Sequence, residues 1–449
     1  MPSRKARGSI ERAMQASAVV MLVSNDVTRD QRVWKEAKTL QKGGYALSIV
    51  ALKSPSTPAR EVVDGVDIKR VHSRVAARIR ATGERLLHPD SKGLASDFLG
   101  TETSSRGLRA IIRRILSRVL RDSALLVMIL LRDLAFMRHV IGRKAEIVHA
   151  HDLDVLLPAW VMARVCKAKL VYDSHELWTE MGDHCRWFRL FWRLIESRLV
   201  LSCDAVITVC DSIALRLAST YRISQPSVVR NCPYTSRFSG AARGESVAGK
   251  EPCSCVCTQR NQEPLRFIYQ GSFVPMRGLE QLIEAFALVK RDSVLELQGF
   301  GRLERRLRCL IEHYGVAHRV SIIPPVEPEA LVESARRADV GVVPFLPLSL
   351  NNKLALPNKV FEYMMGGLAL CVSDITELAK LVYSQRNGVL FDPFSPGDLA
   401  AKIDQMSCER HRTCEMGRRS REAALRDYNW EKEQEILLDV YATLRSEKR

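Results

Sequence analysis

The sequence contains no long apolar run. Its two longest stretches without a charged residue, 13–25 and 340–352, hold 13 residues each, whereas a helix that spans a membrane needs about 18 or more. We therefore expect no transmembrane helix. The apolar run 18–23 follows a basic tail, but it is shorter than the core of a secretory signal, and Ser-Asn-Asp follows it in place of a cleavage site. We interpret it as a first β-strand and expect a cytoplasmic protein.

Acidic and aromatic residues are both few. The chain has 51 Asp and Glu residues and 68 Lys and Arg residues, which give a formal net charge of +17. Such an excess favours an anionic partner, which can be a nucleic acid, a phospholipid surface or a phosphate-bearing small molecule. No aromatic residues interleave the clustered arginines and no nucleic-acid recognition module is visible, so we expect no nucleic-acid partner.

Cysteine is too dilute for a disulfide scaffold, with 12 residues in a chain of 449. The one cluster, Cys253, Cys255 and Cys257, has neither the CxxC spacing nor a nearby histidine that a zinc site needs. We expect no metal there, and the role of these three cysteines stays open.

Short apolar segments alternate with segments of helical periodicity along most of the chain, which predicts parallel sheets with right-handed crossovers. The alternation stops over 235–263, which is rich in Gly, Ser and Cys, and restarts near residue 266. The sequence therefore predicts an α/β protein with two doubly wound, Rossmann-like domains at 1–235 and 264–427. We place the linker at 236–263 and a final helix within 428–449.

A basic insertion at about 105–142 interrupts the first domain. Six arginines and no acid lie between residues 106 and 121. On a helical wheel the apolar residues fall on one side and most arginines on the other. The apolar side consists of Leu108, Ile111, Ile112, Ile115 and Val119, and the basic side of Arg106, Arg113, Arg114, Arg118 and Arg121. Either the helix packs on the sheet with a solvated basic face, or it lies on anionic lipid; RNA binding is the poorest of the interpretations.

Two loops of the second domain carry residues suited to a nucleotide diphosphate. The first runs from Gly271 to Arg277 and enters a helix, so that glycine, free amides and a guanidinium can meet phosphate oxygens. The second places Asn358, Lys359 and Glu362 on the first turn of a helix, where a carboxylate suits ribose hydroxyls and a cation suits a diphosphate. The alternatives are a plain surface arginine and a Lys–Glu surface pair.

Several segments in this order resemble the GT-B glycosyltransferases, specifically the large retaining group classed as family 4. They are "DQRVWKEAKTLQKGGYALSIVAL", "IVHAHDLDVLLPA", "LVYDSHELWTE", "CDAVITVCDSIALRL", "FIYQGSFVPMRGLEQLIEAF" and "LPNKVFEYMMGGLALCVSDITEL" with "NGVLFDP". The resemblance covers most of the chain and implies a C-terminal helix that crosses back onto the first domain. It also implies sugar transfer, with retention, from a nucleotide diphosphate sugar on the second domain to an acceptor on the first.

The same resemblance assigns site residues. Arg277, in the loop of Gly271, matches the basic position that holds the diphosphate, Glu362 matches the glutamate at the ribose, and His175 in "DSHE" matches the histidine near the transferred sugar. Asp30 and Arg32 are acceptor-side candidates.

Two departures from the family pattern concern the donor. Leu354 replaces the first glutamate of the pair and Ser272 replaces an arginine, so we predict that Lys359 supplies the missing cation. The Asp152-x-Asp154 pattern matches the DxD of metal-dependent transferases, but it lies in the first domain, far from the predicted donor loops, and we expect no metal cofactor.

The expected activity is glycosyl transfer from a UDP- or GDP-sugar to a glycan or lipid-linked acceptor in cell-envelope polysaccharide assembly. The expected location is the cytoplasm, with the inner face of the cytoplasmic membrane as the site of peripheral binding. A nucleotide-sugar epimerase on the same fold and a non-catalytic scaffold are the alternatives.

Overall fold

The computed structural model describes residues 18–71, 104–140, 144–181, 184–235 and 263–446, with side chains of the insertion from 116 to 138. The basic tail, most of the expected linker, Cys253, Cys255, Cys257 and the side chains of Arg106, Arg113 and Arg114 lie outside the described residues. The chain divides into two compact units. Unit 1 comprises Met1–Ile207, Leu217–Pro226 and Val440–Arg449, and unit 2 comprises Thr208–Arg216 and Ser227–Asp439.

The first sheet has eight strands in the order β3-β4-β2-β1-β5-β6-β7-β8. The strands are β1 (Ala18–Leu22), β2 (Ala46–Leu52), β3 (Arg60–Val63), β4 (Val66–Val71), β5 (Ile147–His151), β6 (Lys169–Ser174), β7 (Ala205–Thr208) and β8 (Ser227–Val228). β1, β2, β4, β5 and β6 pair in parallel, whereas β3 pairs antiparallel with β4. The turn of this hairpin is Asp64-Gly65, both with positive φ, as a two-residue hairpin turn requires.

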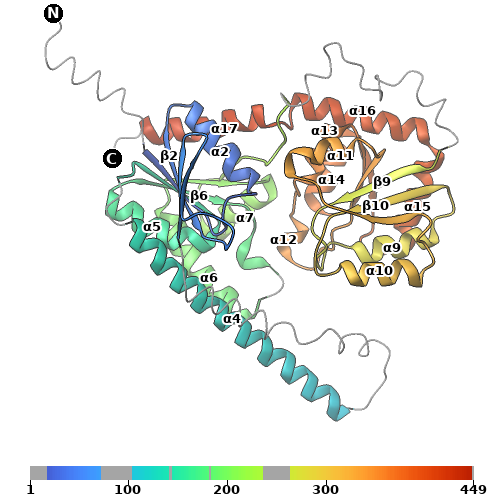
Figure 1. Cartoon of the computed structure of the whole chain (residues 1–449), viewed down its shortest axis with the longest axis horizontal. Helices are drawn as coiled ribbons and strands as arrows, with labels where there is room; N and C mark the ends of the chain where they lie inside the picture. The colour runs from blue at the N-terminus through green and yellow to red at the C-terminus, as the bar shows by residue number, and fades with distance from the viewer. Residues whose placement is uncertain (1–17, 72–103, 141–143, 182–183, 236–262, 447–449) are drawn as a thin grey trace, which may run out of the picture. The chain divides into compact units, whose positions relative to one another are not determined.

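Helices cover both faces of this sheet. Most belong wholly to unit 1: α2 (Gln31–Lys42), α4 (Ser104–Val140), α5 (Leu156–Cys166) and α6 (Arg186–Leu199), with the short η1 (Leu153–Val155), η2 (Trp178–Glu180) and η3 (Val200–Ser202). α7 (Asp211–Tyr221) and α17 (Trp430–Ser446) each contribute only their C-terminal parts to unit 1. Figure 1 shows α2 on one face, and α4, α5 and α6 on the opposite face.

Unit 2 contains a parallel six-stranded sheet in the order β11-β10-β9-β12-β13-β14. Its strands are β9 (Leu265–Gln270), β10 (Ser293–Gln298), β11 (Val320–Ile323), β12 (Val340–Val343), β13 (Ala369–Ser373) and β14 (Gly388–Phe391). Its helices are α9 (Leu279–Leu288), α10 (Glu304–His313), α11 (Leu331–Ala335), α12 (Leu350–Lys353), α13 (Lys359–Gly366), α14 (Thr376–Gln385), α15 (Pro396–Cys408) and α16 (Arg410–Arg426), with the short η5 (Pro328–Ala330).

Alternate residues of one strand enter two different cores, which shows that the second sheet is buried on both faces. Phe267 and Tyr269 of β9 pack in the core that contains Leu282 of α9, while Ile268 packs in the core that contains Val360 of α13. The prediction of two doubly wound α/β domains is confirmed. The β3–β4 hairpin was not predicted. β3 is short and no residue of it is buried, while β4 is six residues long and mostly buried.

The described helices include none that is both long enough and apolar enough to span a bilayer. α4 has the length, with 37 residues, but carries arginines along it.

Candidate donor site and buried charge network

The loop that follows β9 is built around glycines that allow close backbone contacts. Gly271 has φ +132°, and a Cβ atom at Gly299 would lie 1.9 Å from the carbonyl oxygen of Gly271. The amide of Phe273 donates to the carbonyl of Phe300 at 2.8 Å. The loops after β9 and β10 therefore pack directly on each other at the carboxyl edge of the sheet, where ligands of open α/β sheets bind.

Gly278 begins α9 in a conformation that other residues rarely adopt. Its φ is +67°, and a Cβ atom there would lie 1.7 Å from the carbonyl oxygen of Pro344. The neighbouring Met276 has the same positive φ of 67°, a strain often found at functional loops. The turn thus fixes Arg277 between two constrained residues.

We expect Gly278→Ala to lower the free energy of unfolding of unit 2 by at least about 3 kcal/mol, because the left-handed backbone and the clash with Pro344 add together. Gly315 is the matched control, since its φ is +66° and nothing lies within 4 Å of its Cβ position. Gly315→Ala should cost about 1 kcal/mol. Urea denaturation followed by circular dichroism measures both, and equal losses would contradict the packing role of Gly278.

The side chains of two basic residues converge on one aromatic ring in unit 2. Phe345, just after β12, has the guanidinium carbon of Arg277 4.2 Å from its ring centroid and the Nζ atom of Lys359 5.7 Å from it. Lys359 Nζ also lies 3.7 Å from the ring centroid of Tyr269. A Cβ atom at Gly271 would be 3.1 Å from the same Nζ atom. Three predicted donor residues, Gly271, Arg277 and Lys359, therefore lie together.

The surroundings of Lys359 disfavour its charge. Burial of the ammonium lowers the pKa of Lys359 well below its usual value, and the nearby positive charge of Arg277 lowers it further, while Glu362 opposes both effects. Two close cations that share an aromatic floor form a site that an anion would stabilise.

The other two predicted donor residues, Asn358 and Glu362, lie on α13, the helix that begins with Lys359. Asn358 is the N-cap residue of α13, and the amide of Glu362 donates to the carbonyl of Asn358 at 3.2 Å. Asn358 is exposed and Glu362 half-buried. The structure thus places Asn358, Lys359 and Glu362 on one helical turn beside the loop of Arg277, as the sequence pattern indicated.

Asp173, at the end of β6, is the centre of a charge network in unit 1. Both of its carboxylate oxygens accept hydrogen bonds from Arg32, at 2.7 and 2.8 Å. Its Oδ2 atom also lies 2.9 Å from Nε2 of His175 and 3.4 Å from Nδ1 of His151. Burial alone would raise the pKa of Asp173, but Arg32 and His175 outweigh it and hold the pKa well below its usual value.

His175 is held between two carboxylates. Nδ1 of its ring lies 3.2 Å from Asp152, and Nε2 contacts Asp173, while its backbone amide donates to Asp152 at 2.9 Å. Burial would lower the pKa of His175, but the two carboxylates outweigh it, so the pKa lies well above its usual value. A charged imidazole with both N–H groups engaged can supply positive charge to a site, but it cannot serve as a general base at neutral pH.

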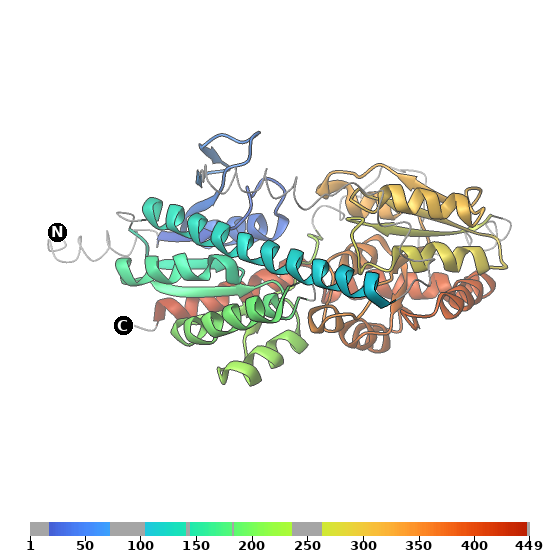
Figure 2. The same ribbon diagram turned by 90° about the horizontal axis from the view of Figure 1, so that it is seen from below.

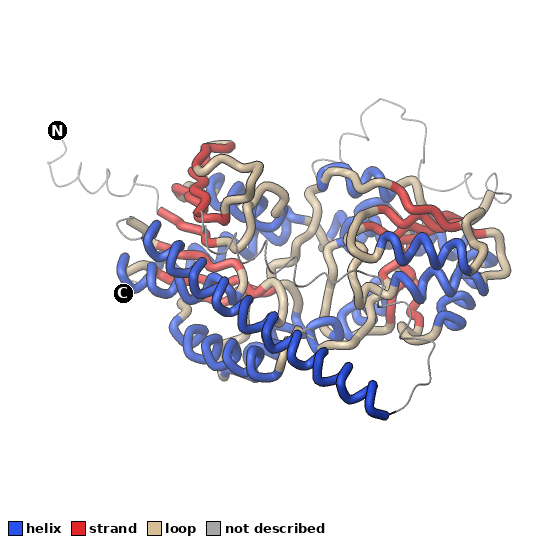
Figure 3. Tube along the Cα trace, turned by 60° about the horizontal axis from the view of Figure 1, so that its bottom comes forward, coloured by secondary structure: helices blue, strands red, loops and turns tan. Residues whose placement is uncertain are grey.

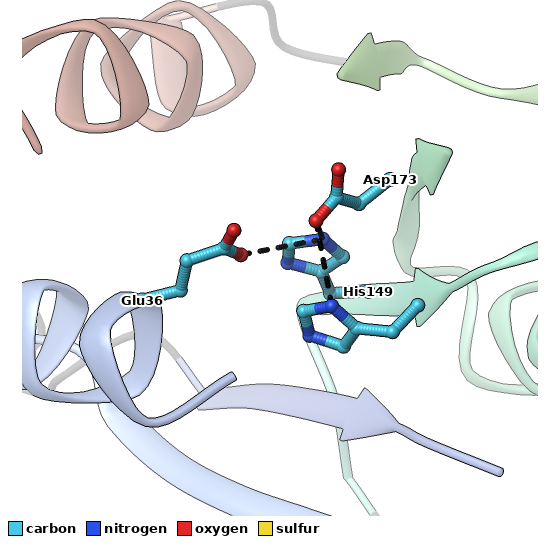
Figure 4. A group of neighbouring side chains, drawn as sticks. Glu36, His149 and Asp173 are labelled. Atoms are coloured by element: carbon cyan, nitrogen blue, oxygen red, sulfur yellow. Dashed lines mark ion pairs between the residues drawn. The ribbon is translucent and has the colours of Figure 1, made fainter. Parts of the chain in front are cut away.

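Asp173 also belongs to a group of four buried side chains of the types that bind metals. Atoms of Glu36, His149, His151 and Asp173 lie within 4.8 Å of one another, and Figure 4 shows Glu36, His149 and Asp173 close together. Arg32 already pairs with both oxygens of Asp173 and lies 3.0 Å from Glu36. The guanidinium thus supplies the positive charge that these carboxyls need, and we interpret the group as an ion-pair network.

The surroundings of Glu36 favour its protonated form. Burial raises the pKa of Glu36 well above its usual value, and the neighbouring Asp173 raises it further, against the effect of Arg32. His149 donates or accepts at Nδ1 with the hydroxyl of Tyr441, at 2.8 Å, and burial lowers its pKa well below the usual value. Asp173 is therefore the carboxylate that faces both Arg32 and His175, and Asp152 is the second carboxylate beside His175.

The two acceptor-side candidates have different surroundings. Arg32 is only 4% exposed and donates to Asp173, so it positions that carboxylate, and its predicted acceptor role stays a prediction. Asp30 accepts from the amide of Val33 as the N-cap of α2 and from the side chain of Asn25 at 2.7 Å. It is half-buried, and its predicted acceptor role stays a prediction.

Sequence patterns missed several members of both groups. Phe345 and Tyr269 are ordinary core aromatics by sequence, and Asp173 and Glu36 lie in motifs whose other residues were singled out. The spacing of Arg32 and Glu36, four residues apart on α2, was the one available signal for the network.

Two family models match the chain and cover most of it between them. The model described as "Glycosyltransferase Family 4" matches residues 31–234, and the one described as "Glycosyl transferases group 1" matches residues 258–424. Glycogen synthase of Mycobacterium tuberculosis is 23% identical over 317 residues, which are 68% of this chain and 70% of the relative. D-inositol 3-phosphate glycosyltransferase of Xylanimonas cellulosilytica is 30% identical over 39% of this chain and 40% of its own.

Solved structures share the fold at low sequence identity. Sucrose-phosphate synthase from Thermosynechococcus elongatus superimposes with a TM-score of 0.69 at 16% identity, covering 96% of this chain and 99% of its own. Anabaena Alr3699/HepE in complex with UDP-glucose gives a TM-score of 0.62 at 12% identity, covering 96% and 100%. The chain is therefore a GT-B glycosyltransferase, with a family 4 domain in its first half and a group 1 domain in its second.

Proposed function

We propose that the protein transfers a sugar from a UDP- or GDP-sugar to a glycan or lipid-linked acceptor during cell-envelope polysaccharide assembly, with retention of anomeric configuration. The observation that carries the donor assignment is the convergence of Arg277 and Lys359 over Phe345 in unit 2. Breaking the sugar–phosphate bond leaves negative charge on the departing diphosphate. Two fixed cations beside backbone amides stabilise that charge.

Names of similar proteins support the donor and acceptor classes. HepE has been solved with UDP-glucose, and TarM with UDP. WaaG is described as acting in lipopolysaccharide biosynthesis, and the WcaL protein of Salmonella typhimurium as a putative colanic acid biosynthesis glycosyltransferase. We place the enzyme in the cytoplasm, peripheral to the inner face of the cytoplasmic membrane, and we propose that it needs no metal cofactor.

His175 is proposed as a charged group beside the transferred sugar. Because both of its nitrogen atoms already face carboxylates, it would act through its positive charge and by fixing Asp152. The Leu354 position lacks the carboxylate that the family pattern places at the sugar ring, so contacts to the sugar must come from other groups.

Product analysis tests the proposal. Purified protein is incubated with a panel of UDP- and GDP-sugars, with and without a polyprenyl-linked or lipopolysaccharide-type acceptor, and products are separated by mass spectrometry. A glycosylated acceptor is expected. An isomerised donor without acceptor would instead show an epimerase, and the absence of turnover with any donor would favour a non-catalytic scaffold.

We expect nucleotide binding to take up protons. Lys359 has a lowered pKa in the free protein, and an adjacent diphosphate favours its charged form, so binding raises the pKa and draws a proton from solvent. Affinity should fall as the pH rises through the pKa of the bound state. Calorimetry at pH 8 in buffers of different ionisation enthalpy should show uptake of up to about one proton per UDP or GDP, lost in Lys359→Met. Unchanged uptake in that variant would contradict the role of Lys359.

A further inference from the structure

The outward face of α4 is apolar, whereas the solvent-facing side of a surface helix is usually polar. Its exposed large side chains are Leu116, Leu120, Val127, Leu130 and Leu134, which are between 42% and 69% exposed. At about 100° per residue these five positions fall within roughly 80° of the helix circumference. We call them the α4 stripe. Asp122, Ile129 and Phe136, which lie on the other side of the helix, are buried.

The helical wheel of residues 106–121 placed arginines on the exposed side, and in the described part of that segment Arg118 is exposed and Val119 half-buried. Farther along α4 the buried side is fixed by polar contacts. Asp122 accepts from the amide of Cys185 at 2.6 Å, and Arg132 pairs with Asp154 of η1 at 2.7 Å. These contacts turn the leucines outward.

The neighbouring helix α6 has the same character. Trp187, Leu190 and Leu194 are 37%, 69% and 56% exposed, and they recur at the three- and four-residue spacing of one helix face. We call them the α6 stripe. Three exposed arginines lie along the same helix: Arg186, Arg193 and Arg198.

α4 and α6 belong to one layer. The crossovers from β4 to β5, from β5 to β6 and from β6 to β7 all move the same way along the sheet, so right-handed connections place α4, α5 and α6 on one face. Asp122 of α4 contacts His184 and Cys185 at the start of α6. Figures 2 and 3, turned toward this side, show the three helices lying along one another.

No exposed acid interrupts this layer in its described part. The acidic residues of α4, α5 and α6 are Asp122, Asp133 and Glu196, which are at most 3% exposed. The exposed charges of α4 are Arg138, at the edge of the α4 stripe, and Arg118, on the opposite side of the helix. Outward leucines that lie near cations and near no exposed acid of this layer are complementary to a surface that offers both acyl chains and negative headgroups. A second copy of the same face would oppose arginine to arginine.

We infer that the α4 and α6 stripes together form the face by which unit 1 docks on an anionic phospholipid bilayer, the leucines entering the acyl boundary and the arginines meeting headgroup phosphates. The inference rests on the proposed function in one respect: docking would bring a lipid-linked acceptor to the enzyme. The docking itself can be measured without donor or acceptor.

Vesicle flotation of the full-length protein tests this face. Binding is compared for vesicles of phosphatidylcholine alone and with 30% phosphatidylglycerol, a composition that we choose to be about that of an anionic bacterial surface. We expect at least about tenfold tighter binding to the anionic vesicles, weakening as salt rises. L190S/L194S and L120S/V127S should each lower binding by about tenfold or more, because less apolar surface enters the bilayer.

The matched control is L288S/L425S, which replaces two unit 2 leucines of similar exposure, 51% and 47%, and should leave vesicle binding unchanged. UDP or GDP titration of every variant separates the two proposals, since the docking variants should bind nucleotide as the wild type does. Equal binding to neutral vesicles, no vesicle binding, or stripe variants that bind normally would each overturn the inference. The inference would also be overturned if light scattering showed a dimer for the wild type and a monomer for both stripe variants.

Discussion

Asp173→Asn is expected to lower the free energy of unfolding of unit 1 by about 3–5 kcal/mol, because removal of one partner from a buried ion pair leaves the other charge without compensation. Asp173 is fully buried and accepts both hydrogen bonds from Arg32, itself 4% exposed. His175 also loses one of its two carboxylates. The asparagine amide fits the same volume but carries no charge to compensate Arg32 or His175.

Glu36→Gln is the matched control for this prediction. Its carboxyl lies in the same network but has a raised pKa, which favours the protonated form. The neutral amide of glutamine resembles that form, so the substitution should cost within about 1 kcal/mol. Five of the six tryptophans lie in unit 1, and their fluorescence in urea reports its unfolding. Similar losses for the two variants would show that Asp173 is not the charged member.

The pH dependence follows from the sign of the shift. The pKa of Asp173 is lower in the folded protein than in the unfolded chain, so its stabilisation is present above the unfolded pKa of about 4 and is lost as the pH falls through the folded pKa. The difference between wild type and Asp173→Asn should therefore shrink as the pH falls below about 4. It should also decrease as the pH rises above about 6.5, because Asp173 helps to raise the pKa of His175 and that part of the stabilisation is lost as His175 deprotonates.

The fold could be predicted because a doubly wound sheet leaves a strong pattern in sequence. Strands such as β9 and β12 are buried on both faces, and their apolar runs are easy to recognise between amphipathic helices. The β3–β4 hairpin left no such signal, since a strand at the edge of a sheet needs only part of its residues buried. Fold class thus follows from local pattern where burial is complete.

The donor loops were predictable for a different reason. Gly271, Gly278 and Arg277 combine a backbone requirement with a charge, and both are visible in the letters of one segment. Phe345 and Tyr269 were not, because an aromatic floor beneath two cations looks like any core aromatic until β9 and β12 are placed side by side. The network of Asp173 depends on contacts across 141 residues of sequence, which no local pattern reports.

The orientation of α4 shows the limit of a helical wheel. The wheel separates apolar from basic residues but does not say which side the protein covers. Here buried ion pairs of Arg132 with Asp133 and Asp154 take the inward side. These residues lie beyond the segment 106–121 that the wheel covered, and they share the inward side with the buried Ile129 and Phe136.

Arg277→Ala is expected to weaken UDP or GDP binding by about 100-fold, or about 2.7 kcal/mol, since a guanidinium that binds phosphate contributes a strong charge-assisted pair. Its position is fixed by strained neighbours, Met276 and Gly278, and by contact with Phe345 at 4.2 Å, so no other side chain can take its place without moving the turn. Arg277→Lys should recover only part of the affinity, because an ammonium lacks the planar fork.

Loss of Arg277 should also change Lys359. The charge of Arg277 is one cause of the lowered pKa of Lys359, so its removal raises that pKa and leaves the lysine more fully charged before nucleotide binds. Proton uptake on binding should then shrink in Arg277→Ala, and Arg277→Ala/Lys359→Met should bind more weakly than either single variant. Arg308→Ala is the control, since Arg308 pairs with Glu304 at the surface of unit 2. Isothermal titration of the four variants decides the assignment: wild-type affinity in Arg277→Ala would remove the diphosphate from this loop, and an equal loss in Arg308→Ala would reduce the effect to net charge.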